Sequence, residues 1–279
     1  MDNRTGYNEN NSRYAAYDGG NNNFYSGNNG YGNGMNNNSY YGNGNNGDIY
    51  GAGSSFDSTY SNEETESKVI TRSFIVMFVS LLVTALMATV VAVNKSLFEG
   101  MINSYGIFII IELAVVFGAT FAVKKKNVVV AGILYTMYTV INGMTLSIIF
   151  YAYDLGSVQE IFLMTAVLFA VMAVIGATTN INLSKIGGIC TMFLVGGLIV
   201  TFANILFLHS TGIELALDYI MVAVFIGFTA YDTQRLKVLA REARNDEVNV
   251  IAILCGMELY LDFINLFLRL LAIFGKRRN

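Results

Sequence analysis

The chain has 279 residues, of which 54% are hydrophobic and 13% are charged, whereas roughly 25% of the residues in an ordinary soluble domain are charged. This composition excludes a typical soluble globular protein and indicates a membrane protein. The charge is unevenly divided: the first 67 residues carry two basic and eight acidic side chains, and the remainder carries fifteen and twelve. The formal net charge of −3 therefore describes neither part.

Residues 1–66 differ from the rest of the chain in composition. Sixteen of the first fifty residues are asparagine, and glycine and tyrosine supply most of the others. Because such a segment buries too little apolar surface to offset the entropy of ordering, we expect a disordered tail before a membrane domain at 67–279. The tail is interpreted either as a solvated tether or, through its spaced tyrosines, as a partner-binding or condensing segment.

Seven apolar segments follow the tail. At a helical rise of about 1.5 Å per residue, each is long enough, or nearly so, to cross a hydrocarbon core of about 30 Å. We therefore expect an all-α integral membrane domain with seven transmembrane helices. The expected spans are 70–93, 105–123, 128–152, 160–179, 187–208, 215–235 and 250–274.

Basic residues occur in the tail-proximal segment and in every second break between spans. Because the cytoplasmic side of membrane proteins is enriched in lysine and arginine, the tail and these breaks are expected to be cytoplasmic. A full crossing by 250–274 then places the terminal Lys276, Arg277 and Arg278 on the opposite side, and a re-entrant last segment is the alternative. We expect a bacterial plasma membrane, with a eukaryotic endomembrane as the alternative. The ten basic residues on the first side are Lys68, Arg72, Lys124, Lys125, Lys126, Lys185, Arg235, Lys237, Arg241 and Arg244.

Two aspartates interrupt the last two apolar segments, in FIGFTAYDTQR (225–235) and in ELYLDFINLF (258–267). An ionised carboxylate is expensive in lipid, so such residues face the protein interior. In the last span the polar residues fall on one narrow helical stripe. Antiparallel packing of the two spans could bring Asp232 and Asp262 together. The stripe consists of Glu258, Asp262, Asn265 and Arg269.

Paired carboxylates at a site of low dielectric cannot comfortably both ionise, so the pair is expected to share a proton and to titrate jointly. When ionised, the pair offers hard oxygen ligands suited to Ca²⁺. The alternative interpretation is polar packing that holds helices together. Glu112, alone within its span, is a candidate for the same interior. Lys124 could reach a carboxylate with its flexible stem or extend to the membrane interface.

No motif for nucleotide binding, zinc-protease activity or a serine hydrolase is present, so an enzyme is not expected. The two cysteines, Cys190 and Cys255, lie far apart in apolar runs and are interpreted as buried thiols. We expect no resident cofactor and no nucleic-acid partner. The expected surroundings are the lipid bilayer and Ca²⁺ as a transported ion.

The segments FIGFTAYDTQRLK (225–237) and LYLDFINLFLRLL (259–271) resemble the two strongest signatures of the Bax inhibitor-1 family of membrane proteins. YTMYTVINGMTLS (135–147) and VIGATTNINLSKIGG (174–188) resemble its third span and its fourth span with the following loop. The resemblance covers about 70–279. It implies seven helices, with the last one central and wrapped by the other six, and a pH-sensitive calcium leak.

In this resemblance the gate is a pair of aspartates, which corresponds to Asp232 and Asp262. A basic residue at the cytoplasmic end of the second helix latches onto the pair, and Lys124 occupies that position where a bacterial relative has arginine. Supporting polar residues are expected nearby. Two other functions stay open: a non-transporting regulator that binds a membrane protein such as a protease, and an H⁺-coupled cation exchanger. The expected supporting residues are Glu112, Glu258, Asn265, Arg269 and Tyr231.

Overall fold

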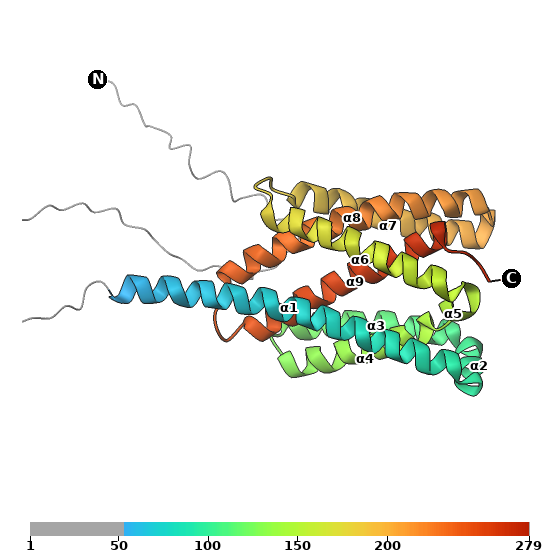
Figure 1. Ribbon diagram of the computed structural model, residues 1–279, viewed down its shortest axis with the longest axis horizontal. Helices are drawn as coiled ribbons and strands as arrows, with labels where there is room; N and C mark the ends of the chain where they lie inside the picture. Colours follow the sequence, from blue (N-terminus) through green and yellow to red (C-terminus); the bar gives the residue numbers. More distant parts are fainter. Residues whose placement is uncertain (1–52, 279) are drawn as a thin grey trace, which may run out of the picture. The chain divides into compact units, whose positions relative to one another are not determined.

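The computed structural model describes residues 53–278, with side chains from Glu63 onward. These residues are almost entirely helical, and seven helices are long and apolar enough to cross a membrane, as predicted (Figure 1). The disorder expected for residues 1–52 lies outside the described residues. The elements are α1 (Gly53–Val93), α2 (Lys95–Asn103), α3 (Tyr105–Lys124), α4 (Val128–Leu146), α5 (Ile149–Ala152), α6 (Leu155–Thr178), α7 (Ser184–Ala203), the π-helical turn η2 (Asn204–Leu208), α8 (Thr211–Glu242) and α9 (Val248–Phe274).

Helix α1 begins at Gly53, well before the expected domain boundary at residue 67. The segment 53–66, which we expected to be disordered, is therefore helical. Near the end of this segment Glu64 pairs with Lys68 one turn later at 2.6 Å, and an acidic residue followed by a basic one at this spacing stabilises a helix. The end of this segment also contacts the loop between α8 and α9. Thr65 donates to Oδ1 of Asn245 at 2.8 Å, and Glu66 pairs with Arg241 at 3.2 Å.

Polar caps and helix-forming side chains account for the other differences in helix limits. Asp154 accepts a hydrogen bond from the backbone N–H of Ser157, so α6 begins at Leu155 rather than near 160. Asn94 caps α2 in the same way, within a break expected to be a loop. Helix α8 continues past 235 to Glu242 because the sequence RLKVLARE consists of good helix formers.

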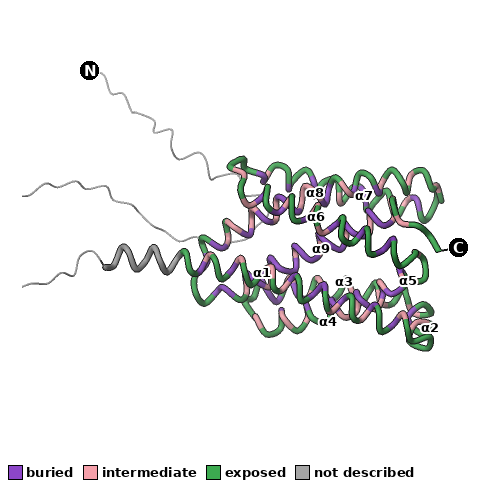
Figure 2. The backbone as a smooth tube through the Cα atoms, viewed as in Figure 1, coloured by how far each residue is buried: buried purple, intermediate pink, exposed green. Residues whose placement is uncertain are grey.

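Helix α9 is the central helix of the membrane domain. It crosses between a group formed by α1, α3 and α4 and a group formed by α6, α7 and α8 (Figure 1). Its neighbours are α1, α3, α4, α6 and α8, whereas α7 packs mainly on α8. Within its most apolar window, 72% of the residues of α9 are buried, a larger share than in any other span (Figure 2). A central last helix was the arrangement that the family resemblance implied.

The C-terminal segment folds back over the connection between α5 and α6. Tyr153 and Arg277 form an isolated antiparallel bridge, and Asp154 donates its backbone N–H to the carbonyl of Lys276 at 2.9 Å. Gly275 allows this approach, since a Cβ there would lie 2.7 Å from the ring of Tyr153. Helix α9 is continuous over 27 residues, so it is long enough for a full crossing rather than a re-entrant segment.

Candidate functional site

The polar stripe of α9 faces α8, and the two helices meet at three charged positions. Near the α8–α9 loop, Arg235 pairs with Glu258 at 2.6 Å. At the middle position, the carboxyl groups of Asp232 and Asp262 lie against each other. Near the other end, Arg269 pairs with Asp218 at 2.7 Å. The antiparallel packing that the sequence suggested therefore brings the two predicted aspartates together.

The two aspartates differ in burial and in hydrogen bonding. Asp262 is only 5% exposed, and its Oδ2 atom is enclosed without a hydrogen-bond partner among the described residues. Asp232 is partly buried and lies beside it from α8. An ionised carboxylate is acceptor-only. Two carboxyl groups in contact therefore have no donor between them unless one of them carries a proton.

Small residues bring the surrounding helices close to the aspartates. A Cβ on Gly176 of α6 would lie 2.1 Å from the backbone oxygen of Ala230, two residues before Asp232. A Cβ on Gly227 would lie 2.6 Å from the sulfur of Cys190 on α7. Both cysteines are free and buried, as expected. Helices α6 and α7 therefore pack closely on α8 just before Asp232.

The aspartate pair lies near one end of the bundle. Gln234 donates to the carbonyl of Ile181 at 2.8 Å and accepts from the backbone N–H of Leu183 at 2.8 Å. These contacts fix α8 to the connection between α6 and α7, two residues beyond Asp232. We call this end the basic face. It consists of the α3–α4 turn (125–127), the α6–α7 connection (179–183) and the α8–α9 loop (243–247).

The structure does not place Lys124 beside the aspartates. Lys124 is exposed at the end of α3, and no ion pair joins it to either aspartate among residues 63–278. The cation next to the pair is Arg235, one turn after Asp232 on α8. From the sequence, Arg235 is expected only as one of the ten basic residues on the cytoplasmic side. Its i,i+3 spacing from Asp232, which puts both side chains on one helix face, is the signal that could have identified it.

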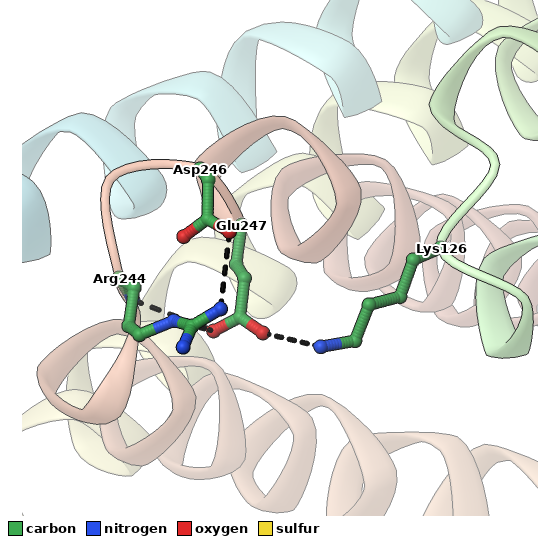
Figure 3. Close-up of polar contacts among 4 residues, drawn as sticks. All are labelled: Lys126, Arg244, Asp246 and Glu247. Atoms are coloured by element: carbon green, nitrogen blue, oxygen red, sulfur yellow. Dashed lines mark hydrogen bonds and ion pairs between the residues drawn. The ribbon is translucent and has the colours of Figure 1, made fainter.

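The lysine of the α3–α4 turn that does bind an acidic group is Lys126. Its Nζ lies 2.7 Å from Oε1 of Glu247, which is buried in the α8–α9 loop (Figure 3). Arg244 approaches the other carboxylate oxygen at 3.8 Å and pairs with Asp246 at 3.1 Å. Lys126 has a φ of 55°, which is uncommon for a residue other than glycine. The hydrogen bond from Lys126 lowers the pKa of Glu247.

We expect Lys126→Met to lower the free energy of unfolding by about 1 kcal/mol at neutral pH, a value between those of exposed and buried ion pairs. Because the pKa of Glu247 is lowered, this contribution is complete above its ordinary value of 4.5 and is lost as the pH falls through the lowered value. Thermal unfolding of both proteins between pH 3 and 8 measures the difference. The control Lys124→Met should leave stability unchanged, and a difference that persists at the lowest pH would contradict the assignment.

A second polar cluster lies on another face of α9. Glu112 on α3 accepts from Oγ1 of Thr145 at 2.6 Å, and Asn142 also hydrogen-bonds to it. Asn142 accepts from the hydroxyl of Tyr260, which is 2.7 Å from Oγ1 of Thr84. Glu112 therefore faces the protein interior, as predicted, but contacts this cluster rather than the aspartate pair.

The remaining supporting residues have separate partners. Asn265 donates to the carbonyl of Leu261 within its own helix at 2.8 Å. Tyr231 packs its ring against Gly187 of α7, where a Cβ would lie 2.8 Å from the ring. Residues 63–278 contain no group of three or more histidine, cysteine or acidic side chains arranged to hold a metal ion. The oxygens offered to a cation at the centre of this site are therefore those of Asp232 and Asp262.

Comparison with known proteins identifies the family to which this seven-helix arrangement belongs. The profile described as "Inhibitor of apoptosis-promoting Bax1" matches residues 66–279. The chain is a member of the Bax inhibitor-1 family. It is 38% identical over 209 residues to the inner membrane protein YbhL of Escherichia coli, covering 72% of this chain and 88% of YbhL. It is also 34% identical over 230 residues to an uncharacterised protein of Borreliella burgdorferi, covering 80% of this chain and 99% of that protein.

Membership of the Bax inhibitor-1 family covers the whole membrane domain and begins within α1. The printed name of YbhL places that relative in a bacterial inner membrane. At the α8–α9 interface of this family member, the buried Asp262 lies beside the partly buried Asp232.

Proposed function

We propose that this protein is a pH-sensitive calcium leak channel whose gate is the Asp232–Asp262 pair. The observation that supports the proposal is the contact of two carboxyl groups inside the membrane domain, where Oδ2 of Asp262 meets no donor among the described residues. A buried polar atom of this kind calls for an explanation. A proton held between the two carboxyl groups would satisfy both.

The proposed gate acts through the number of protons on the pair. With one shared proton, the two carboxyl groups attract each other and hold α8 against α9. Loss of that proton leaves two adjacent negative charges, which repel strongly at low dielectric. Gain of a second proton removes the negative charge that would attract a cation. The contact between the helices and their affinity for a cation therefore both change as the pair titrates.

Calcium suits the proposed site because ionised carboxylates are hard oxygen ligands. The neighbouring Arg235–Glu258 ion pair is neutral overall, so it leaves the charge of the aspartates uncompensated when they ionise. We propose that Ca²⁺ passes the pair in transit rather than residing there. We also propose that the basic face points to the cytoplasm of a bacterial cell, because positively charged residues are retained on that side.

Ion flux through purified protein in sealed liposomes tests this proposal. Calcium entry is followed with an enclosed fluorescent indicator while the pH is stepped on both sides together. A leak channel conducts without a proton gradient, whereas an H⁺-coupled exchanger requires one and a non-transporting regulator gives no flux. Steep pH dependence without an imposed proton gradient is the expected result. Absence of flux at every pH would exclude the channel.

A further inference from the structure

The α8–α9 interface is closed differently on the two sides of the aspartate pair. Toward the basic face, the next contact is Arg235–Glu258, and both side chains are partly exposed, at 38% and 22%. Asp232 itself is only partly buried. The connection between α6 and α7, which marks this end of the bundle, is hydrogen-bonded to Gln234. Partly exposed side chains therefore border the aspartates on the side of the basic face.

Toward the C-terminal end of α9, an apolar layer follows the aspartates. Its members on α8 and α9 are all buried and belong to one apolar core. Aromatic rings of α6 extend the layer: Phe162 lies 5.3 Å from Phe263, and Phe169 lies 5.5 Å from it, between ring centroids. Close-packed side chains of this kind exclude water and ions. The buried members on α8 and α9 are Met221, Val224, Phe225, Phe263 and Leu266.

The Asp218–Arg269 ion pair lies beyond this apolar layer. The Asp218 side chain is 7% exposed and that of Arg269 is 34% exposed, with 2.7 Å between Nη1 and Oδ1. Arg269 is seven residues from Asp262, about 10 Å along the helix. It lies five residues before the end of α9. Two charged contacts, separated by an apolar layer, therefore join α8 to α9 in series.

We propose that the Asp218–Arg269 pair is a second gate, which closes the α8–α9 interface at the end opposite to the basic face. While this gate is closed, the aspartate pair exchanges protons and cations with the basic face alone. In the closed gate, the ion pair with Asp218 neutralises the positive charge of Arg269. Passage through the interface requires the two side chains to separate. The role of this gate in ion flux rests on the proposed function. The prediction that the aspartate pair is reached only from the basic face does not.

Asn265 offers a direct test because it lies on the stripe between Asp262 and Arg269. Asn265→Cys is introduced into protein that carries Cys190→Ala and Cys255→Ala. A membrane-impermeant thiol reagent is then added at the C-terminal face of sealed liposomes. The labelling rate is compared among this protein, the neutral double variant Asp218→Asn/Arg269→Gln and the exchanged variant Asp218→Arg/Arg269→Asp. The neutral variant avoids leaving a single buried charge, so its folding can be checked by an unchanged elution profile.

We expect the neutral variant to be labelled about ten-fold faster from the C-terminal face. A ten-fold increase corresponds to a loss of about 1.4 kcal/mol in the stability of the closed gate. The exchanged variant should return to the slow rate because it restores an ion pair. Labelling from the basic face should be the same in all three proteins. The proposal is overturned if the neutral variant is labelled as slowly as the parent, or if the exchanged variant is labelled as fast as the neutral one. Absence of calcium flux would reject the channel function. The labelling rates would still show whether the Asp218–Arg269 pair closes the α8–α9 interface.

Discussion

Replacing either aspartate at the α8–α9 interface by asparagine is expected to abolish the pH dependence of calcium flux. In the wild-type protein the shared proton belongs to the pair, so neither side chain alone sets the response. Asp232→Asn removes the partner whose charge controls Asp262, and Asp262→Asn does the same from the other helix. In the wild-type protein, we expect the flux to change at least about ten-fold across the pH transition, which is the effect of one pH unit on one proton. In either variant, the change should be less than about two-fold.

The double variant Asp232→Asn/Asp262→Asn should add little to either single change. Residues that act as one unit show non-additive effects, whereas independent residues show additive ones. Glu160→Gln is the matched control, since Glu160 is an exposed acidic residue in the first turns of α6. It should retain the wild-type pH profile. Single variants that keep the wild-type midpoint, or whose effects add, would show that the aspartates act separately.

The second large effect is expected at Gly176, where α6 touches the backbone of α8. A Cβ at this position would lie 2.1 Å from the carbonyl oxygen of Ala230 and 2.9 Å from its carbonyl carbon. Helix backbone cannot yield as a flexible side chain would, so Gly176→Ala must push α6 away from α8. Overpacking of this kind commonly costs up to about 3 kcal/mol. The corresponding loss in Tm is about 10 °C for a domain of this size.

Gly188→Ala provides the control for this prediction. Gly188 lies in helix α7, and a Cβ there would meet no atom within 4 Å. Because alanine favours the helix over glycine, this change should leave the Tm unchanged or raise it slightly. Thermal unfolding in one detergent gives both values. A Gly176→Ala protein as stable as the wild type would mean that α6 and α8 do not pack as closely as described.

The helical architecture could be predicted from the sequence because hydrocarbon thickness constrains each span directly. Apolar segments of sufficient length are visible without knowledge of their partners, and the seven expected spans coincide with the seven long helices. The stripe on α9 was equally accessible, since Glu258, Asp262 and Arg269 share one helix face. A helix that is apolar elsewhere directs such a stripe toward protein.

The partners of the stripe on α8 were harder to predict because they lie near expected span limits. Asp218 stands close to the expected start of the sixth span at 215, where a charge indicates the membrane interface, whereas Ser210 caps α8 and the helix includes Asp218 as a buried residue. Arg235 stands at the expected end of the same span, although α8 continues to Glu242. A shift of a helix limit by one or two turns thus converted two charges of the membrane interior into apparent surface charges.

The choice between Lys124 and Lys126 depends on turn geometry, which periodicity does not describe. Both lysines belong to the run of three lysines at 124–126, and the sequence gives no reason to prefer Lys126. The left-handed backbone of Lys126 directs its side chain toward Glu247, far along the chain in the α8–α9 loop. Such a contact links two loops whose relative position follows only from the packed bundle.

The position of α9 at the centre of the bundle also determines when the protein can be completed. This helix is synthesised after the five spans that pack against it. Until it enters the bilayer, Asp218, Arg235 and Thr84 have no partner from α9. A nascent chain that stops before Val248 therefore presents buried charges to lipid and to the quality-control proteases of the membrane. Completion of the membrane domain therefore depends on α9.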